Sequence, residues 1–169
     1  MANTRSLPVV KPVADINLEQ VGRTDDDEGP QVGTATMTGL DYSDIGAIFQ
    51  AAGQALGVNV YKHPKNSDAY FSRSDNQSLA NQGARAYARR GVLVSGLSRR
   101  RRPLGQIDYT NMEKVDRVVA LGIYRIAQNS VAPRRNSANP KPAKYLEAWK
   151  RITPNDGTVS ARSILSGAV

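Results

Sequence analysis

The sequence predicts an α/β fold, because segments with strand-like and helix-like patterns alternate along its 169 residues. Residues 12–22 alternate apolar and polar side chains with a period of two, which is typical of a half-buried strand. Residues 111–128 repeat apolar side chains at the spacing of an amphipathic helix. These patterns favour a layered domain in which helices pack on a sheet.

The first elements are expected to be two strands separated by a polar loop. The strand over residues 12–22 has an apolar face formed by Ala14, Ile16 and Leu18. Residues 23–30 are polar and acidic, and the Gly-Pro pair at their end breaks regular structure. A second, short strand is expected over residues 31–37.

A helix is expected from Tyr42 to about Leu56, followed by a strand over residues 58–61. Asp41 is the predicted N-cap, and Gly57 marks the C-terminal end. The apolar residues at helical spacing are Ile45, Ile48, Phe49, Ala52 and Leu56. The segment therefore predicts a strand–helix–strand unit.

The C-terminal half is expected to be mainly helical. Residues 74–83 predict a short capped helix that ends at a glycine, and residues 143–152 predict a last helix. The helix over 111–128 has an apolar stripe of Met112, Val115, Val119, Gly122, Ile123 and Ile126. Residues 153–169 are polar and rich in turn formers, so we expect a loosely ordered tail.

The positive charge of the chain is concentrated in one segment. The net charge is +8, with 23 basic and 15 acidic residues. Between residues 84 and 105 there is no acidic residue, and seven arginines occur: Arg85, Arg89, Arg90, Arg99, Arg100, Arg101 and Arg102. Without these, 16 basic residues face 15 acidic ones, so the rest of the chain is almost neutral.

Composition also limits the kinds of site and location. The chain has no cysteine, so a zinc site would use carboxylate and imidazole ligands. No apolar run approaches the length of about 18 residues that a membrane helix needs, and we expect no membrane span. The first eight residues have no apolar stretch of signal-peptide length.

Four segments occur in an order that resembles one family of enzymes. Residues 16–23, Ile-Asn-Leu-Glu-Gln-Val-Gly-Arg, are similar to the strand motif N-[IL]-[DE]-x-[IV]-G. Residues 74–83 are similar to the segment S-D-[HN]-x-x-[FL]-x-x-x-G. Ile-Asp-Tyr at residues 107–109 and the helix after it resemble a D-x-I-D-Y stretch and the long closing helix. These motifs, in this order, resemble the leucyl-aminopeptidase-like zinc peptidases, whose distant members include glutamate carboxypeptidase II and the transferrin receptor.

The resemblance implies a fold and an activity. Residues 8–152 would be the C-terminal half of a peptidase catalytic domain, part of a three-layer αβα fold with a mostly parallel sheet, incomplete at its N-terminal side. In this family two zinc ions lie at the C-terminal edge of the sheet and hydrolyse the N-terminal residue from a peptide. Intact relatives are often secreted or periplasmic.

The resemblance also assigns roles to individual residues. Glu19 matches the carboxylate that binds one zinc ion, with a solvent-facing strand glutamate as the alternative. Ser74, Asp75 and Asn76 would lie near the site with structural roles, and Asp75 would cap the short helix. Phe71 lies near the position of a tyrosine that assists the reaction in relatives. His63, the one histidine of the chain, is expected in a loop without a metal.

Most of the expected metal ligands are missing from this sequence. The bridging aspartate, the first histidine, the catalytic glutamate and a further carboxylate precede the strand motif in the family, and only 18 residues precede Glu19 here. The last histidine belongs to a [DY]-Y-H-x-x-x-D motif before Ile107, where the arginine-rich segment stands instead. We therefore expect an inactive fragment that does not bind zinc stably.

A reading-frame shift over residues 84–106 would explain both the missing histidine and the arginines. Residues 97–102, Leu-Ser-Arg-Arg-Arg-Arg, are compatible with the codons CTA TCA CGC CGT CGG CGA followed by C. Read one base later, the same bases encode Tyr-His-Ala-Val-Gly-Asp, which fits the zinc motif. The hypothesis is that the frame is restored at Ile107.

Two other functions remain open. One is a non-catalytic remnant that keeps the scaffold, with activity restored only if a second polypeptide supplies the N-terminal half. The other is a basic nucleic-acid-binding protein, in which the seven arginines neutralise phosphates. No helix-turn-helix, RNP or zinc-finger pattern supports the second alternative.

Overall fold

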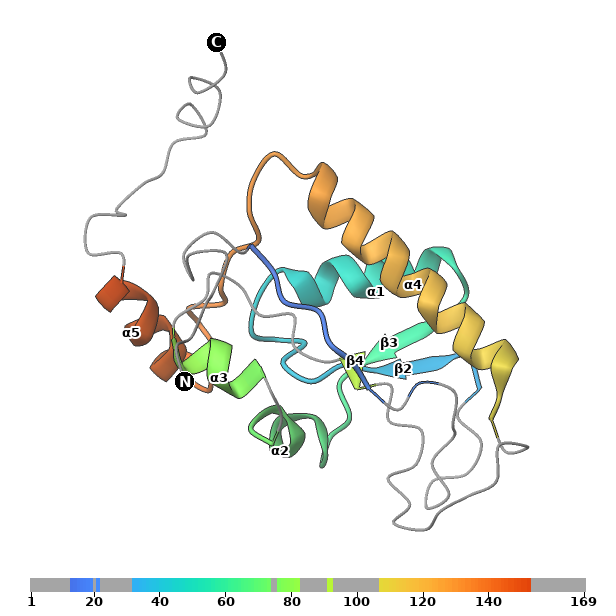
Figure 1. Ribbon diagram of the computed structural model, residues 1–169, viewed down its shortest axis with the longest axis horizontal. Helices are drawn as coiled ribbons and strands as arrows, with labels where there is room; N and C mark the ends of the chain where they lie inside the picture. The colour runs from blue at the N-terminus through green and yellow to red at the C-terminus, as the bar shows by residue number, and fades with distance from the viewer. Residues whose placement is uncertain are drawn as a thin grey trace, which may run out of the picture.

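The computed structural model describes residues 13–19, 21, 32–73, 76–82, 91–92 and 107–152. Short strands and helices alternate along these residues (Figure 1). The strands are β1 (Leu18–Glu19), β2 (Thr34–Thr36), β3 (Asn59–Tyr61) and β4 (Gly91–Val92). The helices are α1 (Ile45–Ala55), α2 (Ser67–Phe71), α3 (Asn76–Asn81), α4 (Tyr109–Gln128) and α5 (Ala143–Ile152). The α/β class predicted from the sequence is confirmed.

The described strands form two parallel ladders. β2 pairs with β3, with Ala35 opposite Val60. β1 pairs with β4, with Leu18 opposite Gly91, and β4 lies beside β2. Parallel neighbours need a crossover connection, and α1 provides it between β2 and β3. The strand–helix–strand unit predicted for residues 31–61 is therefore present, and in the strand predicted over 12–22 the described pairing is that of Leu18–Glu19.

The predicted start of α1 at Tyr42 is wrong. The helix begins at Ile45 after Asp44, and Asp41 lies in the preceding turn, where its carboxylate binds Lys62 instead of a helix N-terminus. Gly46 explains why the turn and the helix pack so closely, because a Cβ atom there would lie 1.8 Å from the Leu40 carbonyl oxygen. The predicted end is confirmed, since Gly57 has a φ of +68° directly after the helix.

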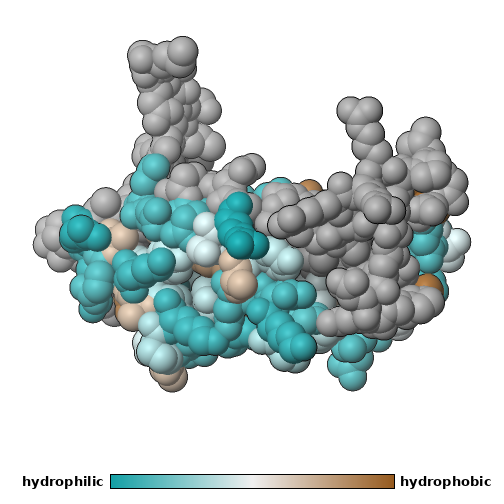
Figure 2. All heavy atoms as spheres, turned by 90° about the horizontal axis from the view of Figure 1, so that it is seen from below, coloured by the Kyte–Doolittle hydropathy of each residue, from teal (hydrophilic) through white to brown (hydrophobic). Residues whose placement is uncertain are grey.

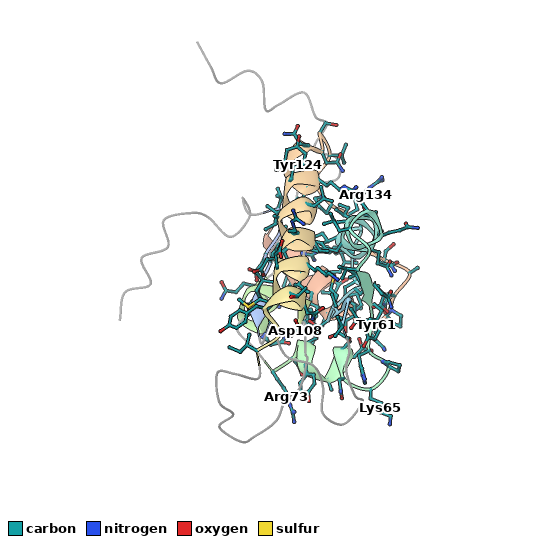
Figure 3. All side chains as sticks on the ribbon, turned by 90° about the vertical axis from the view of Figure 1, so that its right-hand side faces the viewer. Tyr61, Lys65, Arg73, Asp108, Tyr124 and Arg134 are labelled. Carbon is teal, nitrogen blue, oxygen red and sulfur yellow. The ribbon has the colours of Figure 1, made fainter. Side chains whose placement is uncertain are left out.

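Helix α4 is the longest described element, and its ends and packing follow from particular residues (Figure 3). The Asp108 carboxylate accepts a hydrogen bond from the Asn111 amide at 2.9 Å and so caps the first turn. Asn111 is buried, and its side-chain oxygen accepts a bond of 2.7 Å from the Gly33 amide before β2. In the middle of the helix, Gly122 leaves room for the Phe49 ring of α1. This contact brings the two helices together.

Helices α1 and α4 cover one face of the strands, and the main core lies between them (Figure 1). The strand residues in this core alternate along the chain: Ala35 and Met37, then Val58 and Val60. The helical residues are Ile45, Phe49 and Ala52 of α1 and Val115, Val118, Val119 and Ile126 of α4. Leu56 and Ile123, which we predicted on the apolar stripes, are 38% and 46% exposed.

The other positions of the same strands are polar. Thr34 and Thr36 in β2, and Asn59 and Tyr61 in β3, alternate with the core residues. A parallel sheet covered by helices on both faces normally has apolar residues at nearly every position. The described residues show one helical layer, on the apolar sheet face. Thr36 on the other face is only 7% exposed, so that face is covered as well.

A smaller aromatic core lies below the strands in Figure 1, near α2, α3 and α5. Phe71 of α2 is 2% exposed, and its ring centroid lies 4.7 Å from that of Tyr42 and 5.5 Å from that of Tyr145. The Tyr145 hydroxyl donates to the Gln77 side-chain oxygen at 2.9 Å, which ties α5 to α3. Phe71 is therefore a buried core residue, because its side chain packs between two aromatic rings and is not accessible to a substrate. Sequence reasoning did not predict α2.

The outer surface on the side of α2 is mostly hydrophilic, with separate hydrophobic side chains (Figure 2). Among the helices that the structure describes, none is both long enough and apolar enough to span a bilayer. The proposed tail, residues 153–169, and all of the anomalous segment 84–106 except Gly91 and Val92 lie outside the described residues.

Candidate functional site

The residues selected from the sequence are only partly within the described structure. Glu19 is the last residue of β1 and pairs with Val92, and its side chain lies outside the description. Ser74 and Asp75 are also outside the described residues, and Asn76 is described only as the first backbone residue of α3. The seven arginines of the basic segment lie outside as well. The structure therefore does not bring these predicted residues into one described site.

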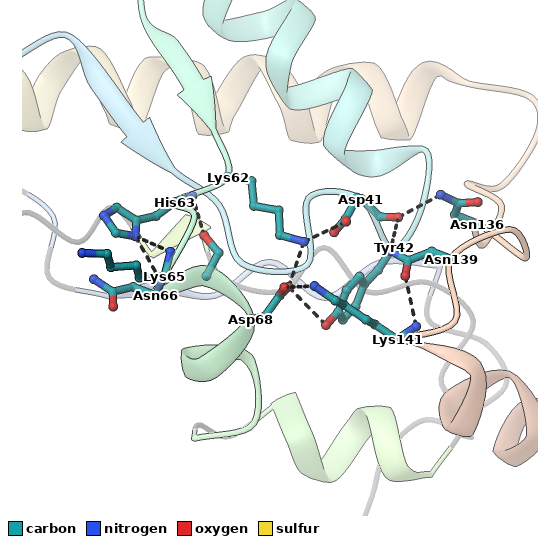
Figure 4. A network of polar contacts seen from close by, with 11 residues as sticks. Asp41, Tyr42, Lys62, His63, Lys65, Asn66, Asp68, Asn136, Asn139 and Lys141 are labelled. Carbon is teal, nitrogen blue, oxygen red and sulfur yellow. Dashed lines mark hydrogen bonds and ion pairs between the residues drawn. The ribbon is translucent and has the colours of Figure 1, made fainter.

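His63 has a structural role at the start of α2. The residue is 8% exposed, and its Nδ1 atom accepts hydrogen bonds from the backbone amides of Lys65 (3.2 Å) and Asn66 (3.0 Å) (Figure 4). Its own amide donates to the Ser67 hydroxyl at 2.9 Å. An Nδ1 atom that accepts two amides is not available to a metal ion at that position.

The most concentrated polar chemistry in the described residues lies beyond the ends of β2 and β3 (Figure 4). We call Asp41, Tyr42, Lys62, Asp68 and Lys141 the edge cluster. The Lys62 ammonium lies 2.7 Å from Asp41 Oδ2 and 2.9 Å from Asp68 Oδ1. Lys141 binds the other oxygen of Asp68, and the Tyr42 hydroxyl donates to Asp68 at 3.4 Å. Four separate stretches of chain meet at these contacts.

Local structure explains how each member reaches the edge cluster. Lys62 directly follows the last residue of β3, and Asp41 follows β2 in a tight turn that begins at Gly39, whose φ is +64°. Asp68 is in the first turn of α2 and Lys141 precedes α5. Parallel strands end at the same edge of a sheet, so the residues after β2 and β3 meet there.

The segment before α5 is held to the same turn by two asparagines. The side-chain amides of Asn136 and Asn139 donate to the Asp41 carbonyl oxygen at 3.0 and 3.3 Å. The Asp41 Oδ1 atom is buried and has no hydrogen-bond partner among the described residues. A buried acceptor without a donor is costly, and the ion pair of Oδ2 with Lys62 offsets part of this cost.

The electrostatics of the edge cluster shift the pKa values of Asp68, Lys62 and Tyr42. Burial raises the pKa of Asp68, but hydrogen bonds from Lys141 and Lys62 lower it below its ordinary value. Burial lowers the pKa of Lys62, but its hydrogen bonds to Asp41 and Asp68 raise it above its ordinary value. Burial, together with the charges of Asp68 and Asp41, raises the pKa of Tyr42 well above its usual range.

These shifts make the edge cluster unsuited to proton transfer near neutral pH. A general acid or base works best when its pKa lies close to the working pH, and here all three groups are moved away from it. Asp68 stays a carboxylate, Lys62 stays an ammonium and Tyr42 stays a phenol. The cluster is therefore an ion-pair clamp between chain segments.

Sequence reasoning missed the edge cluster for a simple reason. Its charged members are far apart in the chain, and charged residues in loops have no periodicity that would mark them. A usable signal exists for two of them, because Asp41 and Lys62 follow predicted parallel strands. Nothing in the sequence singles out Asp68 or Lys141.

The described residues alone do not assemble a metal centre. Among them, no three His, Cys, Asp or Glu side chains lie together in a way that would hold a metal ion. In the edge cluster, the cations beside the carboxylates are the ammonium groups of Lys62 and Lys141. The zinc site implied by the resemblance would thus depend on Glu19 and on groups beyond the described part of the chain.

A cavity between the sheet and helices α1 and α4 is also unsuited to a substrate. Its volume is about 20 Å³, which is room for about one water molecule, and its walls are almost entirely apolar. It lies between β1, β2 and helices α1 and α4, and Ile16 and Leu18 form the wall on the β1 side. The cavity is a small apolar packing defect of the core.

Comparison of the chain with models of protein families, with curated proteins and with solved structures finds no match.

Proposed function

We propose that this chain is the C-terminal part of a zinc-dependent aminopeptidase domain that keeps its scaffold without a working metal centre. The observation that carries the proposal is the position of Glu19, which ends a strand in a parallel ladder. Ligands of parallel α/β proteins are held beyond the carboxyl ends of the strands. The peptidase motif requires its zinc-binding carboxylate at this kind of position. The order of the helices after it, with α4 as the long closing helix, also supports the proposal.

The contacts at the carboxyl edge favour an inactive form. Lys62 and Lys141 neutralise the carboxylates of Asp41 and Asp68, so these acids do not replace missing zinc ligands. His63 uses Nδ1 for two backbone amides. A single carboxylate such as Glu19 binds zinc only weakly, because structural affinity needs several ligands held together. On this proposal, activity needs a second polypeptide that supplies the other ligands.

The frame-shift hypothesis belongs to the same proposal and has a test of its own. The other reading frame over residues 97–102 is expected to encode Tyr-His-Ala-Val-Gly-Asp. Sequencing the gene decides this directly, because codons that do not yield this motif in another frame contradict the hypothesis. The peptidase ancestry would still rest on the strand motif and the α4 segment in that case.

The main test measures zinc content and turnover of a leucyl chromogenic substrate by the purified 169-residue chain. We expect less than one zinc ion per chain and no turnover. A zinc titration then compares the wild type with Glu19→Gln and with Glu113→Gln. Glu113 is the matched control, because it is 66% exposed on α4 and pairs only with Arg117 among the described residues.

The titration has a clear expected order. The weak zinc affinity falls in Glu19→Gln and stays unchanged in Glu113→Gln, if Glu19 is a retained ligand. Zinc near two ions per chain with turnover would overturn the inactive-fragment proposal. Equal affinities in all three proteins would remove the assignment of Glu19.

The same preparation tests the nucleic-acid alternative. Binding to random double-stranded DNA is measured at low and high salt, because phosphate contacts make affinity fall steeply with salt. We expect no strongly salt-dependent binding. Tight binding that disappears at high salt would favour a function of the arginine-rich segment over the peptidase ancestry.

A further inference from the structure

The buried apolar side chains of the described residues form two separate cores. The main core lies between the strands and helices α1 and α4 and contains eleven buried residues. The smaller core contains four, which are Tyr42, Phe71, Ala80 and Tyr145. The last three belong to α2, α3 and α5, which lie below the strands in Figure 1. We call these three helices the lower helices.

Packing between the described elements follows the same division. α3 packs against α5, and the ring centroid of Phe71 in α2 lies 5.5 Å from that of Tyr145 in α5. In the other part of the molecule, α1 packs against α4 and β3. Among the described helices and strands, no extensive contact joins a lower helix to α1, to α4 or to a strand. The lower helices are therefore a packing unit of their own.

One aromatic ring and two polar contacts attach α2 to the carboxyl ends of β2 and β3. Tyr42 lies in the turn between β2 and α1, and its ring centroid is 4.7 Å from that of Phe71. The Tyr42 hydroxyl donates to Asp68 at 3.4 Å, and the Lys62 ammonium lies 2.9 Å from Asp68 Oδ1 (Figure 4). The side chains of Lys62 and Asp68 are 23% and 28% exposed, so water competes with their ion pair.

The attachment of the segment before α5 is also polar. Asn136 and Asn139 donate to the Asp41 carbonyl oxygen, and Lys141 pairs with Asp68. In the same turn, Asp41 Oδ1 is buried without a hydrogen-bond partner among the described residues. A buried acceptor without a donor costs free energy, so the closed arrangement is less favourable than its ion pairs alone would make it.

We propose that the lower helices are a lid, which opens as one unit from the carboxyl ends of β2 and β3 while α1, α4 and the strands stay folded. A core of four residues buries less apolar surface than a core of eleven, so its opening requires less free energy than global unfolding. Opening exposes the strand ends at which parallel α/β proteins hold their ligands. The contacts of Asp68 are the latch. The proposal goes beyond the peptidase ancestry and does not depend on it.

Native-state hydrogen exchange of the full chain, measured by NMR at urea concentrations below the unfolding transition, tests the proposal. We expect the amides of α5 to exchange through an opening with a smaller urea dependence than the opening that exposes the amides of α4. Val118→Ala removes a buried side chain of the main core and is expected to raise the exchange rates in α4 by about tenfold or more. It leaves the rates in α5 unchanged, because the main core stays folded when the lid opens.

A second variant tests the latch. Asp68→Asn weakens the closed state and is expected to raise the exchange rates in α5 by about tenfold. Asp116→Asn, at an exposed position of α4, is the matched control and leaves the rates in α5 unchanged. Circular dichroism checks the folding of each variant, and Lys141→Gln, which keeps the pair of Lys62 with Asp68, replaces Asp68→Asn if the latter does not fold.

Three results would overturn the lid. In the first, Val118→Ala raises the exchange rates of α5 and α4 by the same factor, so that the chain opens as a single unit. In the second, Asp68→Asn has no more effect on α5 than Asp116→Asn has. In the third, the α5 amides of the wild type exchange as fast as those of an unfolded peptide, so that no closed state exists. Separate responses of α5 and α4 assign the lid whatever the zinc measurements show.

Discussion

Two parts of the molecule differ in how far helices bury their strands. We call β2, α1, β3 and α4 the helix-covered unit, and compare it with the pair formed by β1 and β4. In the first, both strands contribute alternate residues to a core closed by two helices, and Asn111 and Gly122 fix α4 in position. In the second, two-residue strands pair beside a cavity, and Leu18 remains 40% exposed. We therefore expect the β2–β3 pair to be more stable than the β1–β4 pair. The reason is that burial of apolar side chains by helices, and not strand pairing, supplies most of the free energy of folding.

The largest expected effect comes from removing a central side chain of the helix-covered unit. Phe49 is 5% exposed and packs against Gly122 and the strands, so Phe49→Ala is expected to lower the free energy of unfolding by about 3–5 kcal/mol. Leu18→Ala at β1 is the matched comparison and is expected to cost about 1 kcal/mol. Urea unfolding followed by circular dichroism measures both. Equal losses would show that β1 is as firmly held as the helix-covered unit.

An intermediate effect is expected at the edge cluster, which joins the helix-covered unit to α2 and to the segment before α5. Asp68→Asn weakens its pairs with Lys62 and Lys141 and is expected to cost about 1–2 kcal/mol at neutral pH. The folded-state pKa of Asp68 is lower than its ordinary value of about 3.9. Its stabilising contribution is therefore present above this pH and is lost as the pH falls below it.

The pH dependence separates this role from a general effect of charge. Wild-type stability is expected to fall between about pH 4 and pH 2 more steeply than that of Asp68→Asn. Asp116→Asn, at an exposed position of α4, is the control and keeps the wild-type slope. If the free energy of unfolding falls with the same slope at low pH in all three proteins, the role of Asp68 in the clamp is contradicted.

The smallest effect is expected for Tyr42→Phe, which keeps the aromatic packing on Phe71 and removes one hydrogen bond of 3.4 Å. At neutral pH the loss is expected to be within about 1 kcal/mol. Because the folded state raises the pKa of Tyr42, the tyrosine contributes stability below pH ~10 that is lost as the pH rises further. The urea midpoint of Tyr42→Phe is therefore expected to fall less above pH ~10 than that of the wild type.

Tyr124→Phe is the control for that comparison, since Tyr124 is 60% exposed on α4 and should follow the wild type at every pH. A Tyr42→Phe midpoint that tracks the wild type through the alkaline range would show that the hydroxyl has no part in the clamp.

Helix periodicity was the most informative part of the sequence. It predicted α4 and α5 closely and the C-terminal end of α1, because an apolar stripe that must face a core repeats every three or four residues. The start of α1 was misplaced, since Asp41 has the chemistry of an N-cap but binds Lys62, which lies 21 residues further on. Local signals do not show which of two partners a carboxylate will choose.

For the candidate site, the sequence by itself determined the residue types and some of their positions at strand ends. Glu19 was expected at the end of a strand, and β1 ends there. Only the tertiary structure decided that Asp41, Lys62, Asp68 and Lys141 meet, and that His63 accepts the backbone amides of Lys65 and Asn66 just before α2. The physical reason is range: helix and strand patterns arise between near neighbours in the chain, whereas ion pairs depend on how the turns between these elements bring distant charges together.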